Sequence, residues 1–337
     1  MKRTRTLAIL TSAITIFALA ISLTVNANAV VPKTAAPKLK LLWSQEFNHQ
    51  KRTYPDQKVW NFDIGTGENF WGNQEYEFYT DTAGITQGVC PSGMKVKPTD
   101  QRICLDSKNK PHPATGALNI RATKIDSESL EASACYLSTN CFYSTRINTK
   151  GKFSFKYGKM EARIWMPKGD GTWPAFWLLG SNIDSKPWPA CGEIDIVEVG
   201  NDHYTAQGTA HGPVTGFMGM SGAYVADQPL DAGWHTFGLI WTKSILQWTV
   251  DGKPYYTLSS SSKPSTGSID TVGSHSNGGQ TEKWAGLFDH PYFLILNLAM
   301  GGQFVNGAPD PLLTATSMKV DWIRYSSYNG LGTLYKK

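Results

Sequence analysis

The feature that most limits the fold of this chain is a succession of short β-rich runs separated by glycine, proline and asparagine turns. Residues 117–124 alternate apolar and polar side chains, and residues 151–167 carry two such runs that break at Gly158. Residues 235–250 hold another pair, and Asp251-Gly252 then joins two runs in a pattern typical of a tight hairpin. Helical periodicity of useful length is missing outside the first 29 residues. The chain is therefore predicted to be all-β, in a two-sheet sandwich or jelly roll.

The amino terminus predicts an exported protein. Basic residues precede an apolar, uncharged stretch from Leu7 to Val25, and a small-residue pattern suited to a signal peptidase ends at Ala29. A transmembrane anchor is the alternative, but the polar sequence that follows favours cleavage. We expect no membrane association after cleavage and secretion to the periplasm or the medium. The expected organisation is a signal peptide (1–29), a short tether (30–38), one folded domain (39–328) and a C-terminal tail (329–337).

Charge and aromatic content limit the kinds of partner. The whole chain has a formal net charge of +5, and removal of the three cations in the predicted signal peptide leaves 29 basic and 27 acidic residues. Nucleic acid would require a basic stripe, which is absent. The chain also has 12 Trp and 14 Tyr, more than a core usually needs. Because the flat apolar faces of sugars stack on indole rings, this surplus indicates sugar binding, with about half of the Trp expected in the core.

The five cysteines predict two local disulfides. Cys90 with Cys104 and Cys135 with Cys141 are close in sequence, within the polar stretches 84–113 and 126–143. Export favours such bonds, and we interpret both stretches as surface loops that the disulfides hold at the border of a cleft. Cys191 is left over, and we expect a buried free thiol rather than a nucleophile.

Three carboxylates lie within one β-branched run, Glu193-Ile-Asp195-Ile-Val-Glu198-Val. In a regular strand Glu193 and Asp195 share a face, whereas Glu198, five residues after Glu193, points to the opposite face and into the core. An ordinary exposed strand with acidic polar positions is the alternative, but it leaves a lone carboxylate buried at high cost. A β-bulge near Ile196-Val197 would return Glu198 to the face of the other two.

Such a strip of acids suits the cleavage of glycosidic bonds. Crowded carboxylates repel each other, which raises the pKa of at least one and keeps it protonated near neutral pH. Glycosidases need one carboxylate to attack the anomeric carbon and one carboxylic acid to protonate the leaving oxygen. Glu193 and Glu198 are the predicted pair, with Asp195 tuning the nucleophile by hydrogen bonding. The spacing alone does not decide between retention and inversion.

The run resembles the signature of glycoside hydrolase family 16. Two residues separate Asp195 from Glu198, the bulged form typical of the laminarinase branch, the endo-β-1,3-glucanases. Further segments resemble this family in the same order along the mature chain. They are Trp43–Phe47, Trp71–Glu75, Tyr157–Arg163, Gly171–Trp177, Ala210–Pro213, Trp234–Phe237, Leu294–Gly302 and Val320–Arg324.

The resemblance implies a concanavalin-like β-jelly roll with a substrate cleft across its concave sheet, and residues 39–328 as its catalytic domain. It implies Glu193 as nucleophile, Asp195 as assistant and Glu198 as general acid/base. The alternatives are that Trp173 and Trp177 lie in the core, that His211 braces the acids, and that Arg163 serves as a counter-charge. The implied glucose-binding residues are Asn73, Glu75, Glu161, Arg163, Trp173, Trp177, His211 and Asn297.

The resemblance also bears on ions, substrate and alternatives. No cofactor is expected for catalysis, but a structural Ca²⁺ is implied, held by Glu46, Asp321 and the carbonyl of Gly151. The expected protein is a monomer that hydrolyses β-1,3-glucan with retention, with mixed β-1,3/1,4-glucan as a second substrate. A wall-polysaccharide transglycosylase and a non-catalytic β-glucan-binding protein are the alternatives. Binding proteins typically lose one of the acids, whereas this chain has both glutamates.

Overall fold

The computed structural model describes residues 36–47, 54–81, 85–89, 95–97, 100–105, 107–113, 115–213, 220–260 and 284–336. The predicted signal peptide and Cys90 lie outside these ranges. Residues 37–337 form one compact unit. Among the described residues, no helix has both the length and the apolar character that a membrane span requires.

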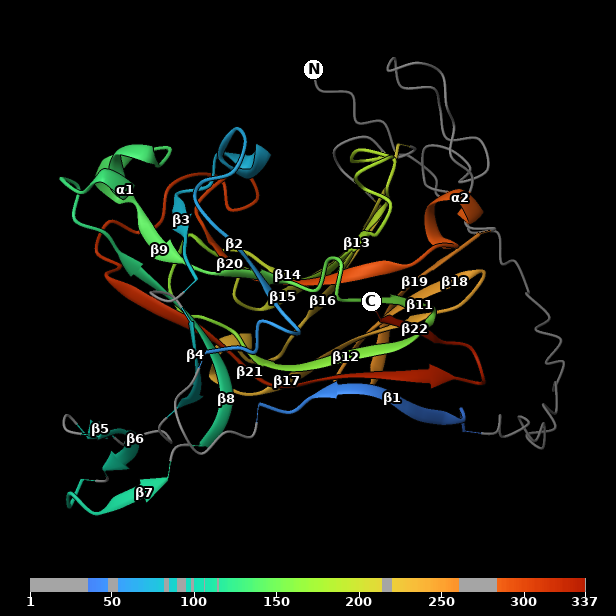
Figure 1. Cartoon of the computed structure of the whole chain (residues 1–337), viewed down its shortest axis with the longest axis horizontal. Coiled ribbons are helices and arrows are strands. Elements are labelled where there is room, and N and C mark those ends of the chain that lie inside the picture. Colours follow the sequence, from blue (N-terminus) through green and yellow to red (C-terminus); the bar gives the residue numbers. More distant parts are fainter. Residues whose placement is uncertain are drawn as a thin grey trace, which may run out of the picture. The chain divides into compact units, whose positions relative to one another are not determined.

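Ten of the described strands form the larger sheet of a two-layer sandwich (Figure 1). Their order is β19-β18-β17-β12-β21-β8-β9-β3, with β1 beside β21 and β4 beside β8. Neighbours are antiparallel except for β3 and β9, which are parallel. The bounds are β1 (Leu39–Gln45), β3 (Glu77–Tyr79), β4 (Ile85–Val89), β8 (Thr115–Lys124), β9 (Phe142–Ser144), β12 (Gly158–Trp165), β17 (His235–Trp241), β18 (Ile245–Val250), β19 (Lys253–Ser259) and β21 (Ala315–Tyr328).

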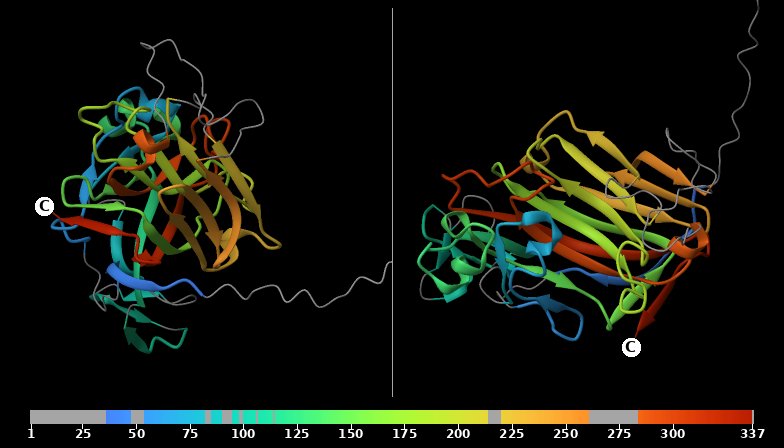
Figure 2. Two further views of the ribbon diagram at one scale, coloured as in Figure 1. Left: turned by 90° about the vertical axis from the view of Figure 1, so that its right-hand side faces the viewer. Right: turned by 90° about the horizontal axis from the view of Figure 1, so that it is seen from above.

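Nine described strands form the second sheet, in the order β16-β15-β14-β13-β20-β10-β2, and β11 connects β20 to β22. The view from above in Figure 2 shows these strands side by side. Their bounds are β2 (Asn61–Asp63), β10 (Arg146–Asn148), β11 (Phe153–Lys156), β13 (Thr172–Gly180), β14 (Glu193–Val199), β15 (Thr205–His211), β16 (Met220–Val225), β20 (Tyr292–Met300) and β22 (Thr333–Lys336).

The remaining described elements are short. A small three-stranded sheet contains β5 (Lys95–Lys97), β6 (Asp100–Leu105) and β7 (Pro111–Pro113). The α-helices are α1 (Leu130–Ala134) and α2 (Trp284–Phe288), and single turns of helix lie at Ser138–Asn140 and Leu230–Ala232. The predicted all-β class is thus confirmed, and so is the hairpin: Val250 pairs with Lys253 across Asp251 (φ 50°) and Gly252 (φ 74°). Positive φ at both turn residues matches the twist of the two strands.

The hydrophobic core lies between the two sheets. In β12, Met160, Ala162 and Ile164 are buried, while the residues between them are only half-buried. This alternation puts one face of the strand in the core and the other outside. In the second sheet β20 is buried along its whole length, Tyr292–Met300. Because both faces of β20 are covered by other parts of the protein, its sequence is apolar almost throughout.

Two sequence expectations need correction. The stretch 84–113, expected to be a surface loop, contains β4, which joins the larger sheet, and the strands of the small sheet. Residues 329–337, expected to be a tail, contain β22, which pairs with β11, and Leu331 and Leu334 pack against the core. Strands of three to six residues carry too little alternation to be recognised, and pairing with other strands stabilises them.

Removal of Leu331–Lys337 should therefore destabilise the protein. The loss of two half-buried leucines and of the β11–β22 hydrogen bonds should cost about 2–4 kcal/mol and lower Tm by roughly 5 °C or more. Differential scanning calorimetry of the shortened protein measures this. Removal of Lys337 alone is the control, and equal Tm values for the two shortened proteins would contradict a stabilising role for β22.

Candidate active site

A β-bulge in β14 places the three carboxylates on one face. Against β15, Asp195 pairs with Thr209 and Glu198 with Gln207, so β14 has one more residue than its partner over this interval. The register against β13 shifts at the same place. The predicted bulge near Ile196-Val197 is therefore confirmed. The core holds the apolar side chains Ile194, Ile196, Val197 and Val199 of this strand.

A tryptophan from the opposite sheet supports the bulge. Trp248 of β18 is fully buried in the core, and its Nε1 donates a hydrogen bond of 2.7 Å to the backbone oxygen of Asp195. Backbone groups beside a bulge lose regular ladder partners, and a buried carbonyl without a partner is costly. Trp248 thus satisfies a main-chain group directly beneath the acids.

The carboxylates contact two side chains that the resemblance named. His211 lies opposite Glu193 in the register, and its Nε2 is 3.0 Å from Asp195 Oδ2 and 3.6 Å from Glu193 Oε1. Trp173 Nε1 donates a hydrogen bond of 2.9 Å to Glu198 Oε1. The structure therefore brings all three acids, His211 and Trp173 together on the outer face of the second sheet.

Burial and mutual repulsion raise the pKa values of these acids. Burial, and then the charge of Asp195, raises the pKa of Glu193 to about 8, while His211 opposes the rise. The same two causes raise the pKa of Glu198 to about 8, against the hydrogen bond from Trp173. Burial raises the pKa of Asp195 to about 8, and a hydrogen bond with Glu193 opposes it. The set therefore retains protons near neutral pH, as a general acid requires.

An arginine held between two indole rings lies beside the acids. The Arg146 guanidinium is 4.4 Å from the ring centre of Trp71 and 4.9 Å from that of Trp177, and Arg146 Nε is 3.0 Å from Asp63 Oδ2. Its charge lowers the pKa of Glu193. Arg146 is not among the residues predicted from the sequence, because β10 has only three residues and the alternation Arg146-Ile147-Asn148 is a weak local signal.

Four more residues of the implied binding set lie near this arginine. Trp177 Nε1 donates to Asn297 Oδ1 at 2.7 Å, and Asn73 Nδ2 donates to Glu75 Oε1 at 3.0 Å. Trp177 is half-buried and, like Trp173, lies outside the main core. Glu75 is buried, and its charge contributes to the raised pKa of Glu198. Asn73, Glu75, Trp177 and Asn297 thus belong to the same site as the acids.

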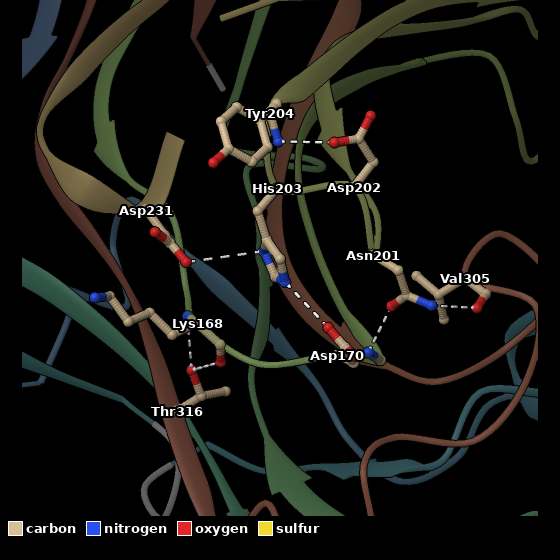
Figure 3. A network of polar contacts seen from close by, with 10 residues as sticks. Lys168, Asp170, Asn201, Asp202, His203, Tyr204, Asp231, Val305 and Thr316 are labelled. Atoms are coloured by element: carbon tan, nitrogen blue, oxygen red, sulfur yellow. Dashed lines mark hydrogen bonds and ion pairs between the residues drawn. The ribbon is translucent and has the colours of Figure 1, made fainter. Parts of the chain in front are cut away.

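A pocket of about 270 Å³ opens beside Glu198, and Gln207, Asp202 and Phe304 line it. Phe304 stacks on Trp173, with ring centres 4.9 Å apart. Asn201 braces the pocket wall: its Oδ1 accepts from Gly171 N at 2.6 Å and its Nδ2 donates to Val305 O at 2.8 Å (Figure 3). The hollow is large enough for a sugar ring and has polar groups to bind hydroxyls.

The same network fixes the neighbouring loops. His203 Nε2 is 3.4 Å from Asp170 Oδ1, and His203 Nδ1 is 3.9 Å from Asp231 Oδ2 (Figure 3). The two aspartates precede β13 and β17, so His203 connects loops of both sheets. His203 therefore ties the loop that carries the pocket residues Asn201 and Asp202 to the loops before β13 and β17.

Glu161 and Arg163, two implied sugar ligands, lie elsewhere. Both are on the outward-facing positions of β12 in the other sheet, where Glu161 pairs with Lys159 at 2.7 Å and Arg163 with Asp321 at 2.6 Å. The core separates this face from the acids. The implied role in binding sugar at the site is wrong for this pair, because strand alternation directs their neighbours Met160 and Ala162 into the core.

The implied Ca²⁺ site would use backbone oxygens of the opening strand and the carboxylate of Asp321, and it stays a prediction; the side-chain carboxylates of Glu46 and Asp321 are both paired with arginines. Arg324 donates to both carboxylate oxygens of Glu46, at 2.9 and 2.8 Å, and lowers the pKa of Glu46. Asp321 pairs with Arg163. Each carboxylate thus already has a cationic partner, whereas Ca²⁺ requires several free oxygen ligands. Gly151 lies in the turn before β11, with φ +70°.

Cys135, Cys141 and Cys191 have unreactive positions. Cys135 and Cys141 form a disulfide, with Cα atoms 5.9 Å apart. Cys191 is a buried free thiol, and burial raises its pKa to about 11. A nucleophilic cysteine would need the opposite shift. The expected bond from Cys90 to Cys104 involves a residue outside the described ranges.

Comparison with known proteins gives a consistent result. Residues 109–292 match the family described as "Glycosyl hydrolases family 16". A Glucan endo-1,3-beta-glucosidase from Cryptopygus antarcticus is 32% identical over 80% of this chain and 83% of its own. Glucan endo-1,3-beta-glucosidase A1 from Niallia circulans is 30% identical over 85% of this chain, which spans only 37% of that protein. The laminarinase catalytic domain from Thermotoga maritima MSB8 has a TM-score of 0.63 and 34% identity over 86% of this chain and 98% of its own.

The raised pKa of Asp195 predicts a pH-dependent gain in stability for Asp195→Asn. Between its ordinary value of 3.8 and about 8, Asp195 is protonated in the folded state and ionised in the unfolded state. The stability of the wild type therefore falls as pH rises through this window, and the Asn variant lacks this loss. Melting curves should show the advantage of the variant growing by about 5 °C or more from pH 5 to pH 8. The exposed Asp227→Asn is the control. A Tm difference between Asp195→Asn and the wild type that does not change with pH would refute the raised pKa of Asp195.

Proposed function

Because this chain belongs to glycosyl hydrolase family 16, we propose that it is a retaining endo-β-1,3-glucanase that hydrolyses laminarin-type β-glucan. One observation carries this proposal: Glu193, Asp195 and Glu198 share one sheet face across the bulge, with Glu198 held by Trp173. The relatives named for endo-1,3-β-glucan cleavage match most of the chain and support the choice of substrate.

The first step uses both glutamates. The carboxylate of Glu193 attacks the anomeric carbon, and the glycosidic carbon–oxygen bond breaks as Glu198 gives its proton to the departing oxygen. The result is a glycosyl ester on Glu193 and a free glucan end. Trp173 fixes the Glu198 carboxyl in place for this transfer. The charge of Arg146 favours the ionised form of Glu193.

The second step reverses the roles. Glu198, now ionised, removes a proton from water, and the oxygen of that water attacks the anomeric carbon and releases Glu193. Asp195 and His211 stay next to Glu193 during both steps, where they supply polar and charged contacts to its carboxyl group. The carboxyl groups supply the nucleophile, the acid and the base, so we propose a reaction without a cofactor.

The site also supports a role in binding glucose units. The half-buried indoles of Trp71 and Trp177 and the stacked pair Trp173 and Phe304 give the site an aromatic lining beside the acids. The pocket residues Gln207 and Asp202 offer hydrogen bonds to hydroxyls, and Asn297 holds the Trp177 indole. Mixed β-1,3/1,4-glucan is a second proposed substrate. The leader-like residues 1–29 support export, and we propose a monomer that acts outside the cytoplasm.

Glu193→Gln should abolish turnover while it preserves binding. Loss of the nucleophile should lower kcat by roughly 10³-fold or more, whereas the amide keeps the shape of the site. Chromatography of products from laminarin, lichenan, xyloglucan and agarose measures activity, and calorimetric titration with a laminari-oligosaccharide measures binding. Wild-type protein should release short β-1,3-oligosaccharides from laminarin. Substantial turnover by the variant would rule out Glu193 as nucleophile, and products longer than the starting oligosaccharides would favour a transglycosylase.

Glu198→Ala should be rescued by azide on a substrate with a good leaving group. Such a substrate needs no acid to form the glycosyl ester, and the azide anion needs no base to attack it. The expected product is a glycosyl azide of β configuration, identified by proton NMR. An α product would mean that the enzyme inverts, and absence of rescue would remove Glu198 from the acid/base role.

A further inference from the structure

A second pair of buried carboxyls, separate from the three on β14, lies at the start of β3. Glu75 is 5% exposed and Glu77 is 1% exposed, and each of the two carboxyls shifts the pKa of the other. Glu77 belongs neither to the implied binding set nor to the proposed reaction. Two ionised carboxylates in contact repel strongly inside a protein, so such a pair keeps a proton.

The surrounding groups locate that proton. Burial raises the pKa of Glu75, but its neighbours oppose this rise. Asn73 Nδ2 is 3.0 Å from Glu75 Oε1, the Tyr79 hydroxyl is 3.5 Å from Glu75 Oε2, and the charge of Arg146 favours the ionised form. These contacts suit a carboxylate. Glu75 therefore acts as the acceptor in the pair.

One carboxyl oxygen of Glu77 has no donor, whereas both oxygens of Glu75 have one. The backbone N–H of Met300 lies 2.8 Å from Glu77 Oε2, while the buried Oε1 meets no donor. Burial, and then the negative charge of Glu75, raises the pKa of Glu77 well above its usual range. An oxygen without a donor beside a carboxylate is suited to carry the proton itself. The proton of the pair is therefore assigned to Glu77, with Glu75 as the acceptor.

The pair is connected to the cleft by two routes. Tyr79 accepts a hydrogen bond of 3.1 Å from Asn297 Nδ2, and Asn297 Oδ1 accepts from Trp177. The hydrogen bond from Met300 to Glu77 holds the end of β20, three residues after Asn297. Both routes end at the side chains beside the acids.

We propose that Glu77 remains a neutral carboxylic acid in the folded protein and is a positioning residue, which holds Glu75 and the end of β20 so that Asn297 and Trp177 keep their places in the substrate site. The substrate readout of this role rests on the proposed function. Because Glu77 touches no reacting atom, its loss should change KM more than kcat.

Two substitutions test the positioning role. In Glu77→Gln the amide nitrogen can donate to Glu75 and the amide oxygen can accept from Met300, as the neutral acid does. Glu77→Met has similar length but neither group. We expect KM for laminari-oligosaccharides to rise about tenfold in Glu77→Met with kcat within about twofold, and to stay near the wild-type value in Glu77→Gln. Equal KM values for the two variants would overturn the positioning role.

Thermal unfolding tests the protonation state without substrate. Above the ordinary value of 4.5, an unfolded Glu77 ionises while the folded one stays protonated, so wild-type stability falls as pH rises. Glu77→Gln lacks this loss, and its Tm advantage should grow steadily from pH 5 to pH 8. The exposed Glu128→Gln is the control. A constant difference for Glu77→Gln would overturn the neutral state.

The kinetic and the thermal experiments distinguish a failure of this inference from a failure of the proposed function. A wild-type protein that cleaves none of the glucans would refute the proposed function, and the slope of the Tm difference would still decide the state of Glu77. If Glu77→Met does not fold, the oligosaccharide affinity of Glu77→Gln decides the positioning role. A tenfold loss of affinity in that variant would overturn it.

Discussion

The structure depends on one irregularity, the bulge in β14. A strand at the centre of a sandwich must keep its apolar side chains in the core, yet this strand also has to present three acids to the other side. The extra residue at Ile196-Val197 changes the alternation once, so both requirements are met. Trp248, from the opposite sheet, donates a hydrogen bond to the backbone carbonyl of Asp195. A core residue thus helps to hold the strand that carries the acids.

The electrostatics of the site follow from this placement. A single sheet face with three neighbouring carboxyls is partly shielded from water, so burial and repulsion raise their pKa values together. His211 and Arg146 oppose the rise at Glu193, and Trp173 and His211 oppose it at Glu198. The two glutamates therefore have different surroundings. Such a difference suits a reaction that needs one ionised and one protonated carboxyl at the same pH.

A second principle appears behind the site, where buried polar groups connect distant strands. Glu77 reaches Met300, Tyr79 reaches Asn297, and Asn201 reaches Val305. Each contact joins segments far apart in sequence. Inside a protein such hydrogen bonds are costly to leave unsatisfied, so they fix the relative positions of strands and loops beside the acids.

The sequence by itself determined the fold class, the hairpin at Asp251-Gly252, and the acid run with its bulge, because periods of two residues and short local patterns encode these features. It also identified Trp173, Trp177, His211 and Asn297 through resemblance.

Only the tertiary structure decided which sheet each strand joins. Glu161 and Arg163 resembled site residues but face outward from the other sheet, Arg146 entered the site from a three-residue strand, and the expected tail became β22. The physical reason is that strand pairing between segments far apart in sequence, and not local propensity, sets which faces meet.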